Sequence, residues 1–130
     1  MKDIAAILFA IYGECKNMHY GASGPIYYAI HLLGDRLIEE LDPLGVIDHL
    51  QEATMLGNGK EAIDWSSIAK PSLIRGTSLK ETCEHLLTLY DALEDCLSDK
   101  DFNCGDESYW TGVMDKVNLC RGFVIKTMGE

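Results

Sequence analysis

Five residues in the first half of the chain have the types and the spacing of metal ligands. His31 and Asp35 are four residues apart, and His19 lies twelve residues before His31. Residues four positions apart share one face of a helix. Imidazole nitrogen and carboxylate oxygen are ligands for iron-type metals, so His31 and Asp35 form half of a metal site. Asp48 and Glu52 repeat the four-residue spacing further along the chain.

Helices must position these residues, because the apolar side chains around them recur at the spacing of helices in a bundle. A first helix is predicted from Ile4, Leu8, Ile11, Cys15 and Met18, and a second from Ile26, Ile30, Leu33, Leu37 and Leu41. The first helix should end near Gly21. A second helix should then begin at Gly24-Pro25, since proline is tolerated in a first helical turn. His19 therefore lies near the end of the first helix, and His31 lies on the second.

The face of the second helix that carries His31 and Asp35 is predicted to point away from the helix's own core. At about 100° per residue, these side chains point roughly 120–160° from the centre of the apolar stripe. The same face carries Tyr27 and Ile38, so it mixes apolar groups with the ligand types. We therefore expect another protein surface to cover it, most simply a second copy of the chain.

The rest of the chain predicts a break, a crossover and two more helices. Pro43 and Gly45 interrupt or distort the second helix, and a helical pattern then resumes as far as residues 57–59. The long connection that follows contains one short helix over residues 64–69, which includes Trp65. A connection of this length can cross a bundle from end to end.

Ser78 opens the third helix, and Glu81 completes a capping box. The apolar stripe of this helix is Leu79, Cys83, Leu86, Tyr90, Leu93 and Leu97, and that of the fourth helix is Trp110, Val113, Val117, Cys120 and Val124. A polar loop over residues 98–108 joins them. The predicted fold is an all-α four-helix bundle in one domain, residues 1–130.

Composition excludes several classes of function. The chain has 11 Lys and Arg against 21 Asp and Glu, which gives a formal net charge of −10. This charge repels phosphate backbones, so we expect no direct binding to DNA. No apolar run approaches the roughly 20 residues that span a bilayer, and no secretory signal pattern is present. We therefore expect a cytoplasmic protein without a membrane segment.

The cysteines stand singly, without a C-x-x-C motif, at positions Cys15, Cys83, Cys96, Cys104 and Cys120. This pattern argues against a zinc site or a disulfide framework and predicts reduced thiols. Cys15, Cys83 and Cys120 are interpreted as small apolar residues that face a helical core.

The histidines do not follow the pattern of a di-iron centre inside a bundle, which requires Glu-x-x-His on two helices. The residues three positions before His31, His49 and His85 are Tyr28, Val46 and Thr82. A ferritin-type centre inside the bundle is therefore not expected. His49 and His85 are interpreted as surface or interface histidines.

A resemblance to a known family rests on Lys16, His19, Tyr20, Gly24, Tyr27 or Tyr28, His31 and Asp35. This run resembles the ferroxidase motif of the Dps-like mini-ferritins, the DNA-binding proteins from starved cells. That motif reads His-Trp, a glycine, an aromatic residue and then His-x-x-x-Asp, with the same histidine spacing. The family continues with Asp-x-x-x-Glu, which Asp48 and Glu52 match in form. The order of the helices and the short helix with a tryptophan in the crossover are also similar.

The resemblance implies a ferritin-like bundle with a ferroxidase centre shared by two subunits. His19, His31 and Asp35 would come from one chain, and Asp48 and Glu52 from its two-fold mate. The implied activity is oxidation of Fe(II), typically by hydrogen peroxide, with ferric iron stored in a homo-oligomeric shell of twelve subunits. The basic N-terminal arm that many members use on DNA is absent, and Tyr replaces Trp at position 20.

The position of the second acid pair departs from the family pattern, in which it lies two residues closer to Asp35. In a regular helix Asp48 would lie some 220° past Asp35, on the wrong face. The segment 42–45 could absorb the two extra residues as a bulge or a break. Otherwise Glu39 or Asp42, on the same side as Asp35, would be the substitute acids.

Other interpretations stay open at this point. His31 and Asp35 are also explained as a structural pair at a dimer contact, and Asp48 and Glu52 as an exposed acidic face. The chain would then be a non-catalytic ferritin-like assembly or interaction module with a degraded metal site. The same ligands could also hold zinc or manganese without redox turnover.

Overall fold

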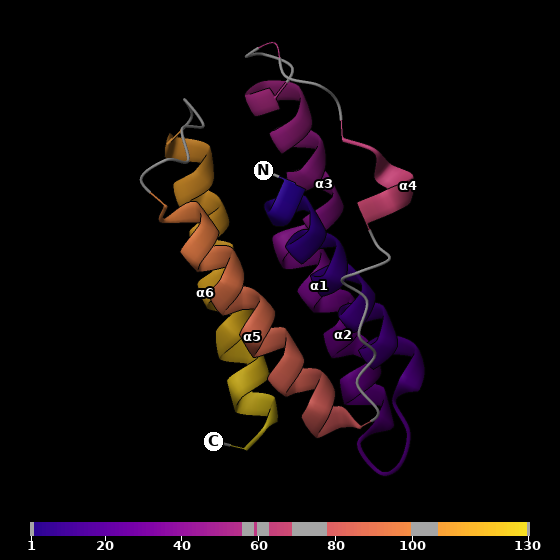
Figure 1. Cartoon of the computed structure of the whole chain (residues 1–130). Coiled ribbons are helices and arrows are strands. Elements are labelled where there is room, and N and C mark those ends of the chain that lie inside the picture. Colours follow the sequence, from indigo (N-terminus) through magenta and orange to yellow (C-terminus); the bar gives the residue numbers. More distant parts are fainter. Residues whose placement is uncertain (1, 56–58, 60–62, 69–77, 100–106, 130) are drawn as a thin grey trace.

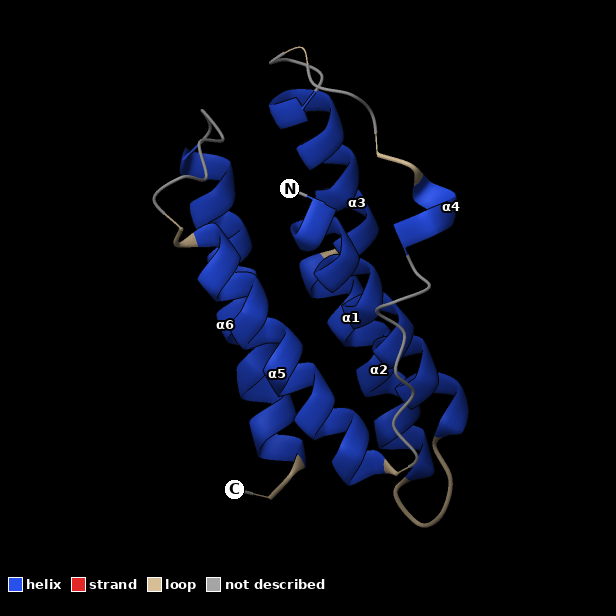
Figure 2. Cartoon of the chain, viewed as in Figure 1, coloured by secondary structure: helices blue, strands red, loops and turns tan. Residues whose placement is uncertain are grey.

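The computed structural model describes residues 2–55, 59, 63–68, 78–99 and 107–129. These residues are predominantly helical and contain no strand (Figure 2). The elements are α1 (Lys2–Gly21), α2 (Tyr27–Leu41), α3 (Pro43–His49), a π-helical turn (Leu50–Met55), α4 (Trp65–Ile68), α5 (Leu79–Leu97) and α6 (Glu107–Thr127). Within this described part, no helix is long and apolar enough to cross a membrane. The prediction of an all-α fold is confirmed.

The long helices close into a bundle. α1 packs against α2 and α5, α5 packs against α6, and α6 packs against α2. In Figure 1 the chain descends along α1 and ascends along α2 and α3, then ascends along α5 and descends along α6. Helices in contact therefore run in opposite directions. The end of α3 and the start of α5 lie at opposite ends of the bundle.

The core is built from the predicted apolar stripes. On α6 all five predicted positions are buried: Trp110, Val113, Val117, Cys120 and Val124. The largest fully buried side chains on the other helices include Leu8, Ile11, Leu37, Ile47, Leu86, Tyr90 and Leu93. Two positions at the starts of stripes differ from the prediction, because Ile26 is 57% exposed and Leu79 is 36% exposed. Each stands at the end of its helix, where the bundle offers fewer neighbours.

The predicted interruption after α2 is a break rather than a continuous helix. Asp42 has a left-handed backbone, with φ of 52°, and Pro43 begins α3 in the next position. The Asp42 carboxylate caps α3 by accepting a hydrogen bond from the backbone N–H of Gly45, at 3.3 Å. A Cβ at position 45 would meet that carboxylate, so a larger residue there would require the Asp42 side chain to shift. Proline at a first helical position and an aspartate cap both favour a new helix start.

The predicted start of α5 and the short crossover helix are also confirmed. The Ser78 hydroxyl accepts a hydrogen bond from the backbone N–H of Glu81 at 3.1 Å, as a capping residue should. The short helix is α4, in which Trp65 donates its indole N–H to the side-chain oxygen of Gln51 at 2.9 Å. The predicted helix end at residues 57–59 falls almost wholly outside the described residues.

The described cysteines are free thiols, and Cys15, Cys83 and Cys120 are buried as predicted. Burial raises the pKa of Cys15 and Cys83 above the usual value and raises the pKa of Cys120 to about 11. The thiol is the form that persists at neutral pH, so these residues act as small apolar groups in the core. Cys104 lies outside the described residues.

Candidate functional site

The candidate site begins with an unusually close approach of two helices. A Cβ added at Gly34 on α2 would lie 2.7 Å from the carbonyl oxygen of Cys15 and 2.8 Å from the backbone nitrogen of His19, both on α1. These separations are shorter than normal contacts, so only glycine allows the two backbones to come this close. The last turns of α1 are thereby pressed against the first turns of α2.

At this contact His19 and His31 bind each other's backbone, and we refer to them as the outer histidine pair. Nδ1 of His19 lies 2.8 Å from the carbonyl oxygen of His31, and Nδ1 of His31 lies 2.7 Å from the carbonyl oxygen of His19. The two rings are stacked, with centroids 3.7 Å apart and planes 24° apart. The arrangement is reciprocal, so each histidine fixes the ring of the other.

These two hydrogen bonds determine the tautomer of both rings. A carbonyl oxygen can only accept, so the proton must lie on Nδ1 of each imidazole. In a neutral ring the lone pair then lies on Nε2. Histidines that bind metals are commonly oriented in this way, with one ring N–H held by a carbonyl and the other nitrogen on the metal. The outer histidine pair is therefore in the tautomer that binds metal through Nε2.

Asp35 adds a carboxylate to the outer histidine pair. Its Oδ1 atom lies 3.2 Å from Nδ1 of His19, and its side chain is 44% exposed, whereas that of His19 is 12% exposed. The structure therefore brings the predicted ligands His19, His31 and Asp35 close together, with Asp35 at the Nδ1 edge of His19 rather than at Nε2. Neither His31 nor Asp35 is buried in the core of its own bundle.

Exposed tyrosines surround the outer histidine pair, and we call Tyr20, Tyr27 and Tyr28 the tyrosine patch. Tyr20 is 76% exposed and Tyr28 is 67% exposed. The Tyr27 ring stacks on His31 with centroids 5.4 Å apart, and the Tyr20 ring meets His19 edge-on at 4.7 Å. Ile26 and Leu32, which flank these residues in the sequence, are also exposed. Exposed apolar groups gathered in one place are typical of interaction surfaces.

The remaining candidate ligands do not join this cluster within one subunit. Asp48 on α3 and Glu52 in the π-helical turn are both exposed. Of the substitute acids, Glu39 is exposed and Asp42 caps α3. Among the described residues, no group of three or more His, Cys, Asp or Glu side chains is arranged to hold a metal ion. A complete site would therefore need groups beyond the described residues of one subunit.

His49 and His85, which the sequence interprets as surface or interface histidines, are both partly buried. His49 stacks on Tyr109 with centroids 3.5 Å apart and meets Trp110 edge-on. His85 is partly buried and faces Glu14, a carboxylate in the core. Sequence reasoning missed Glu14, although its spacing of three from Ile11 and four from Met18 places it on the inward face of α1.

Comparison with known proteins adds no relative: no family model, no curated protein and no solved structure matches this chain.

Proposed function

We propose that this protein is a Dps-like mini-ferritin that oxidises Fe(II) at a site shared between two subunits. The observation that carries the proposal is the tautomer of the outer histidine pair. Both rings are fixed through Nδ1 by backbone carbonyls, which leaves both Nε2 lone pairs for a metal ion. Two imidazoles and a carboxylate are a common ligand set for Fe(II).

The fold supports the same proposal. The chain has antiparallel neighbours, a long connection between α3 and α5, and the short helix α4 within it. A four-helix bundle with one long crossover is the arrangement of ferritin-like proteins. The ferritin-like interpretation thus agrees with the arrangement of the helices and with the resemblance of residues 16–52 to the family motif.

A second subunit would complete the site. The tyrosine patch borders His19 and His31, and its exposure suits burial against a copy of the same surface about a two-fold axis. In such a dimer Asp48 and Glu52 of the partner subunit would supply the missing carboxylates. Dimers of this kind would build the twelve-subunit shell that the family resemblance implies.

The proposed reaction balances in electrons and in protons. Two Fe(II) ions each lose one electron, and one hydrogen peroxide takes up both electrons and two protons to become two water molecules. The chain's own residues would bind and orient Fe(II), which is the substrate. The net charge of −10 favours the collection of cations.

A second candidate function has an observation in its favour. The outer histidine pair joins α1 to α2 through two hydrogen bonds, which is a sufficient structural role by itself. A non-catalytic ferritin-like assembly module would use the histidines in this way and would not turn over Fe(II). Zinc or manganese bound by the same residues without redox chemistry is a variant of this alternative.

The test is an anaerobic Fe(II) titration followed by peroxide, combined with light scattering to measure the mass. We expect a large closed assembly that consumes Fe(II) and peroxide in a ratio of two to one. The double variant Asp48→Asn with Glu52→Gln should lose this activity and keep its fold, because both side chains are exposed. Asp95→Asn with Asp115→Asn removes the same charge from other exposed positions and should remain active. A small oligomer that leaves Fe(II) unchanged would contradict the proposal.

A further inference from the structure

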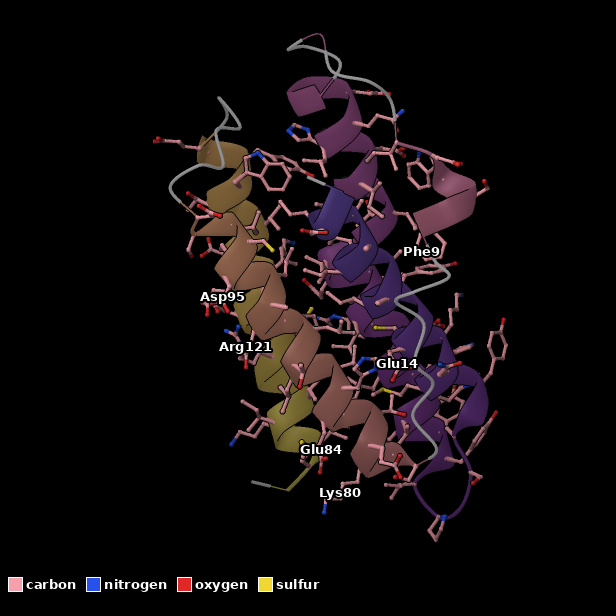
Figure 3. All side chains as sticks on the ribbon, viewed as in Figure 1. Phe9, Glu14, Lys80, Glu84, Asp95 and Arg121 are labelled. Atoms are coloured by element: carbon pink, nitrogen blue, oxygen red, sulfur yellow. The ribbon has the colours of Figure 1, made fainter. Side chains whose placement is uncertain are left out.

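A second polar cluster lies in the interior, between α1 and α5. The side chain of Glu14 on α1 is 3% exposed. Figure 3 shows it inside the bundle, whereas Lys80 and Glu84 on α5 point outward. One carboxylate oxygen, Oε1, accepts a hydrogen bond from the side-chain amide of Asn17 at 2.9 Å. A buried carboxylate needs partners for both oxygens, so the environment of Oε2 decides what this cluster does.

The neighbour of Oε2 is His85, and we call Glu14 and His85 the inner pair. Oε2 lies 3.3 Å from Nδ1 of His85. Both atoms are buried, and neither has a hydrogen-bond partner in the described part of the chain. The pair is thus close without a well-aligned N–H···O bond. Two buried polar atoms that face each other without a hydrogen bond lack a partner that a bound cation could supply.

Geometry selects the kind of group that fits. At metal–ligand distances of about 2.0–2.2 Å, donors 3.3 Å apart subtend an angle of about 100–110° at a metal ion. This is close to the angle between ligands of a tetrahedral site. An ammonium group would lie about 2.9 Å from each atom, where the pair subtends only about 70°, which is too narrow for two of its N–H bonds. A small divalent metal therefore fits better than an organic cation.

We propose that Glu14 Oε2 and His85 Nδ1 bind a divalent transition-metal cation inside the subunit. The ligand chemistry, one carboxylate oxygen and one imidazole nitrogen, suits zinc, cobalt or Fe(II). No third His, Cys, Asp or Glu of the described chain joins the pair, so water would complete the coordination.

A cavity of about 280 Å³ lies near the inner pair at the end of the bundle, and Asn17 and Thr82 line it. Asn17 lies one helical turn from Glu14 on α1, and Thr82 lies one turn from His85 on α5. The His85 side chain is itself 22% exposed. The proposed inner site uses none of the residues of the outer histidine pair, so the two sites can be tested separately.

The experiment is a calorimetric titration of the full chain with Co²⁺, with absorption spectra recorded in parallel. The decisive variant is Glu14→Gln, because its side-chain oxygen can still accept from Asn17 while its NH₂ group can donate to Nδ1 of His85. We expect this variant to fold and to bind Co²⁺ at the inner site about tenfold more weakly or worse. His85→Gln should show the same loss, and Glu107→Gln, which removes an exposed carboxylate, should bind normally.

The outcome separates the inner site from the proposed ferroxidase site. A His31→Ala variant should keep the Co²⁺ binding that Glu14→Gln removes, and Glu14→Gln should keep peroxide-driven oxidation of Fe(II). Unchanged Co²⁺ affinity and stoichiometry in folded Glu14→Gln or His85→Gln would overturn the proposal. So would a result in which His31→Ala alone abolishes all binding.

Discussion

The outer histidine pair and the inner pair use imidazole in opposite ways. In the outer pair, Nδ1 of both His19 and His31 donates to a backbone carbonyl, and the rings lie at a helix contact that is partly open to solvent. In the inner pair, Nδ1 of His85 faces a buried carboxylate oxygen without a hydrogen bond. The Nδ1 atoms of the outer histidine pair therefore have hydrogen-bond partners within the subunit, whereas Nδ1 of His85 has none among the described residues.

This difference shows what each pair depends on. The outer histidine pair depends on the spacing of two helix backbones, because its acceptors are main-chain carbonyls. The inner pair depends on charge, because a buried carboxylate is stable only when its charge is balanced or its oxygens are bonded. A change in backbone spacing should therefore damage the first pair, and a change of charge should alter the second.

The largest expected effect is that of Gly34→Ala. The added Cβ would lie under 3 Å from the backbone of Cys15 and His19, so α1 and α2 must separate. We expect a loss of about 3 kcal/mol in the free energy of unfolding, from overpacking and from weakened hydrogen bonds of the outer histidine pair. Urea denaturation of the wild-type protein and of Gly34→Ala would measure this loss of stability.

Gly122→Ala on α6 is the matched control for this change. No described atom lies within 4 Å of a Cβ built at Gly122. Because alanine is a better helix former than glycine, this variant should gain roughly 0.5–1 kcal/mol. Equal effects of the two substitutions would mean that the close approach at Gly34 does not hold in solution.

High pH tests the burial of Cys120 in the core of the bundle. Burial raises the pKa of Cys120 from 9.0 to about 11. Between these values the unfolded chain releases a proton that the folded chain keeps, so stability is complete below pH 9 and falls as the pH rises toward 11. The slope is about 1.4 kcal/mol per pH unit for one thiol, or roughly 2–3 kcal/mol in total.

Urea midpoints at pH 7, 9 and 10.5 would measure this loss. In Cys120→Ala the decline should be shallower by the share of one thiol, while Cys15 and Tyr90, whose pKa values burial also raises, still contribute. Cys96→Ala, at a less buried position, should change the slope less. An identical pH dependence in wild type and Cys120→Ala would show that this thiol is exposed.

The sequence predicted the helices that carry the site better than it predicted the contacts within the site. The five stripe positions of α6, the Ser78 cap and the break at Pro43 were all predictable, since periodicity, capping and proline act locally. The meeting of His19, His31 and Asp35 followed from their spacing and from the resemblance. The reciprocal hydrogen bonds did not follow, because they depend on the distance between two backbones that Gly34 sets.

Other features lay beyond sequence reasoning for similar reasons. His85 was expected at the surface or at an interface, and nothing in the sequence around it indicates that α5 packs against Glu14. Whether Asp48 and Glu52 reach a metal ion depends on a second molecule. Both side chains are exposed, Asp48 on α3 and Glu52 in the π-helical turn, where a second molecule can reach them.

A smaller effect is expected from His31→Leu. This change removes the donor to the carbonyl of His19 and leaves that oxygen without its partner in a partly buried place. The cost should be about 1–2 kcal/mol. In ¹⁵N-edited spectra of the wild-type protein, His19 and His31 should both carry the proton on Nδ1. A mixture of tautomers at either ring would contradict the Nδ1 hydrogen bonds that distinguish the outer histidine pair from the inner pair.

The last effect, a small gain in stability, is expected from Glu14→Gln without metal. The amide removes a buried charge and can donate to Nδ1 of His85, while its oxygen keeps the hydrogen bond from Asn17. Stability in the presence of a chelator should therefore rise by about 0.5–1.5 kcal/mol. With Co²⁺ added the order should reverse, because ligand binding stabilises only the folded protein that has the site. Wild type more stable than Glu14→Gln in the chelator would mean that Glu14 and His85 already form a satisfied ion pair, and the inner pair would then need no metal.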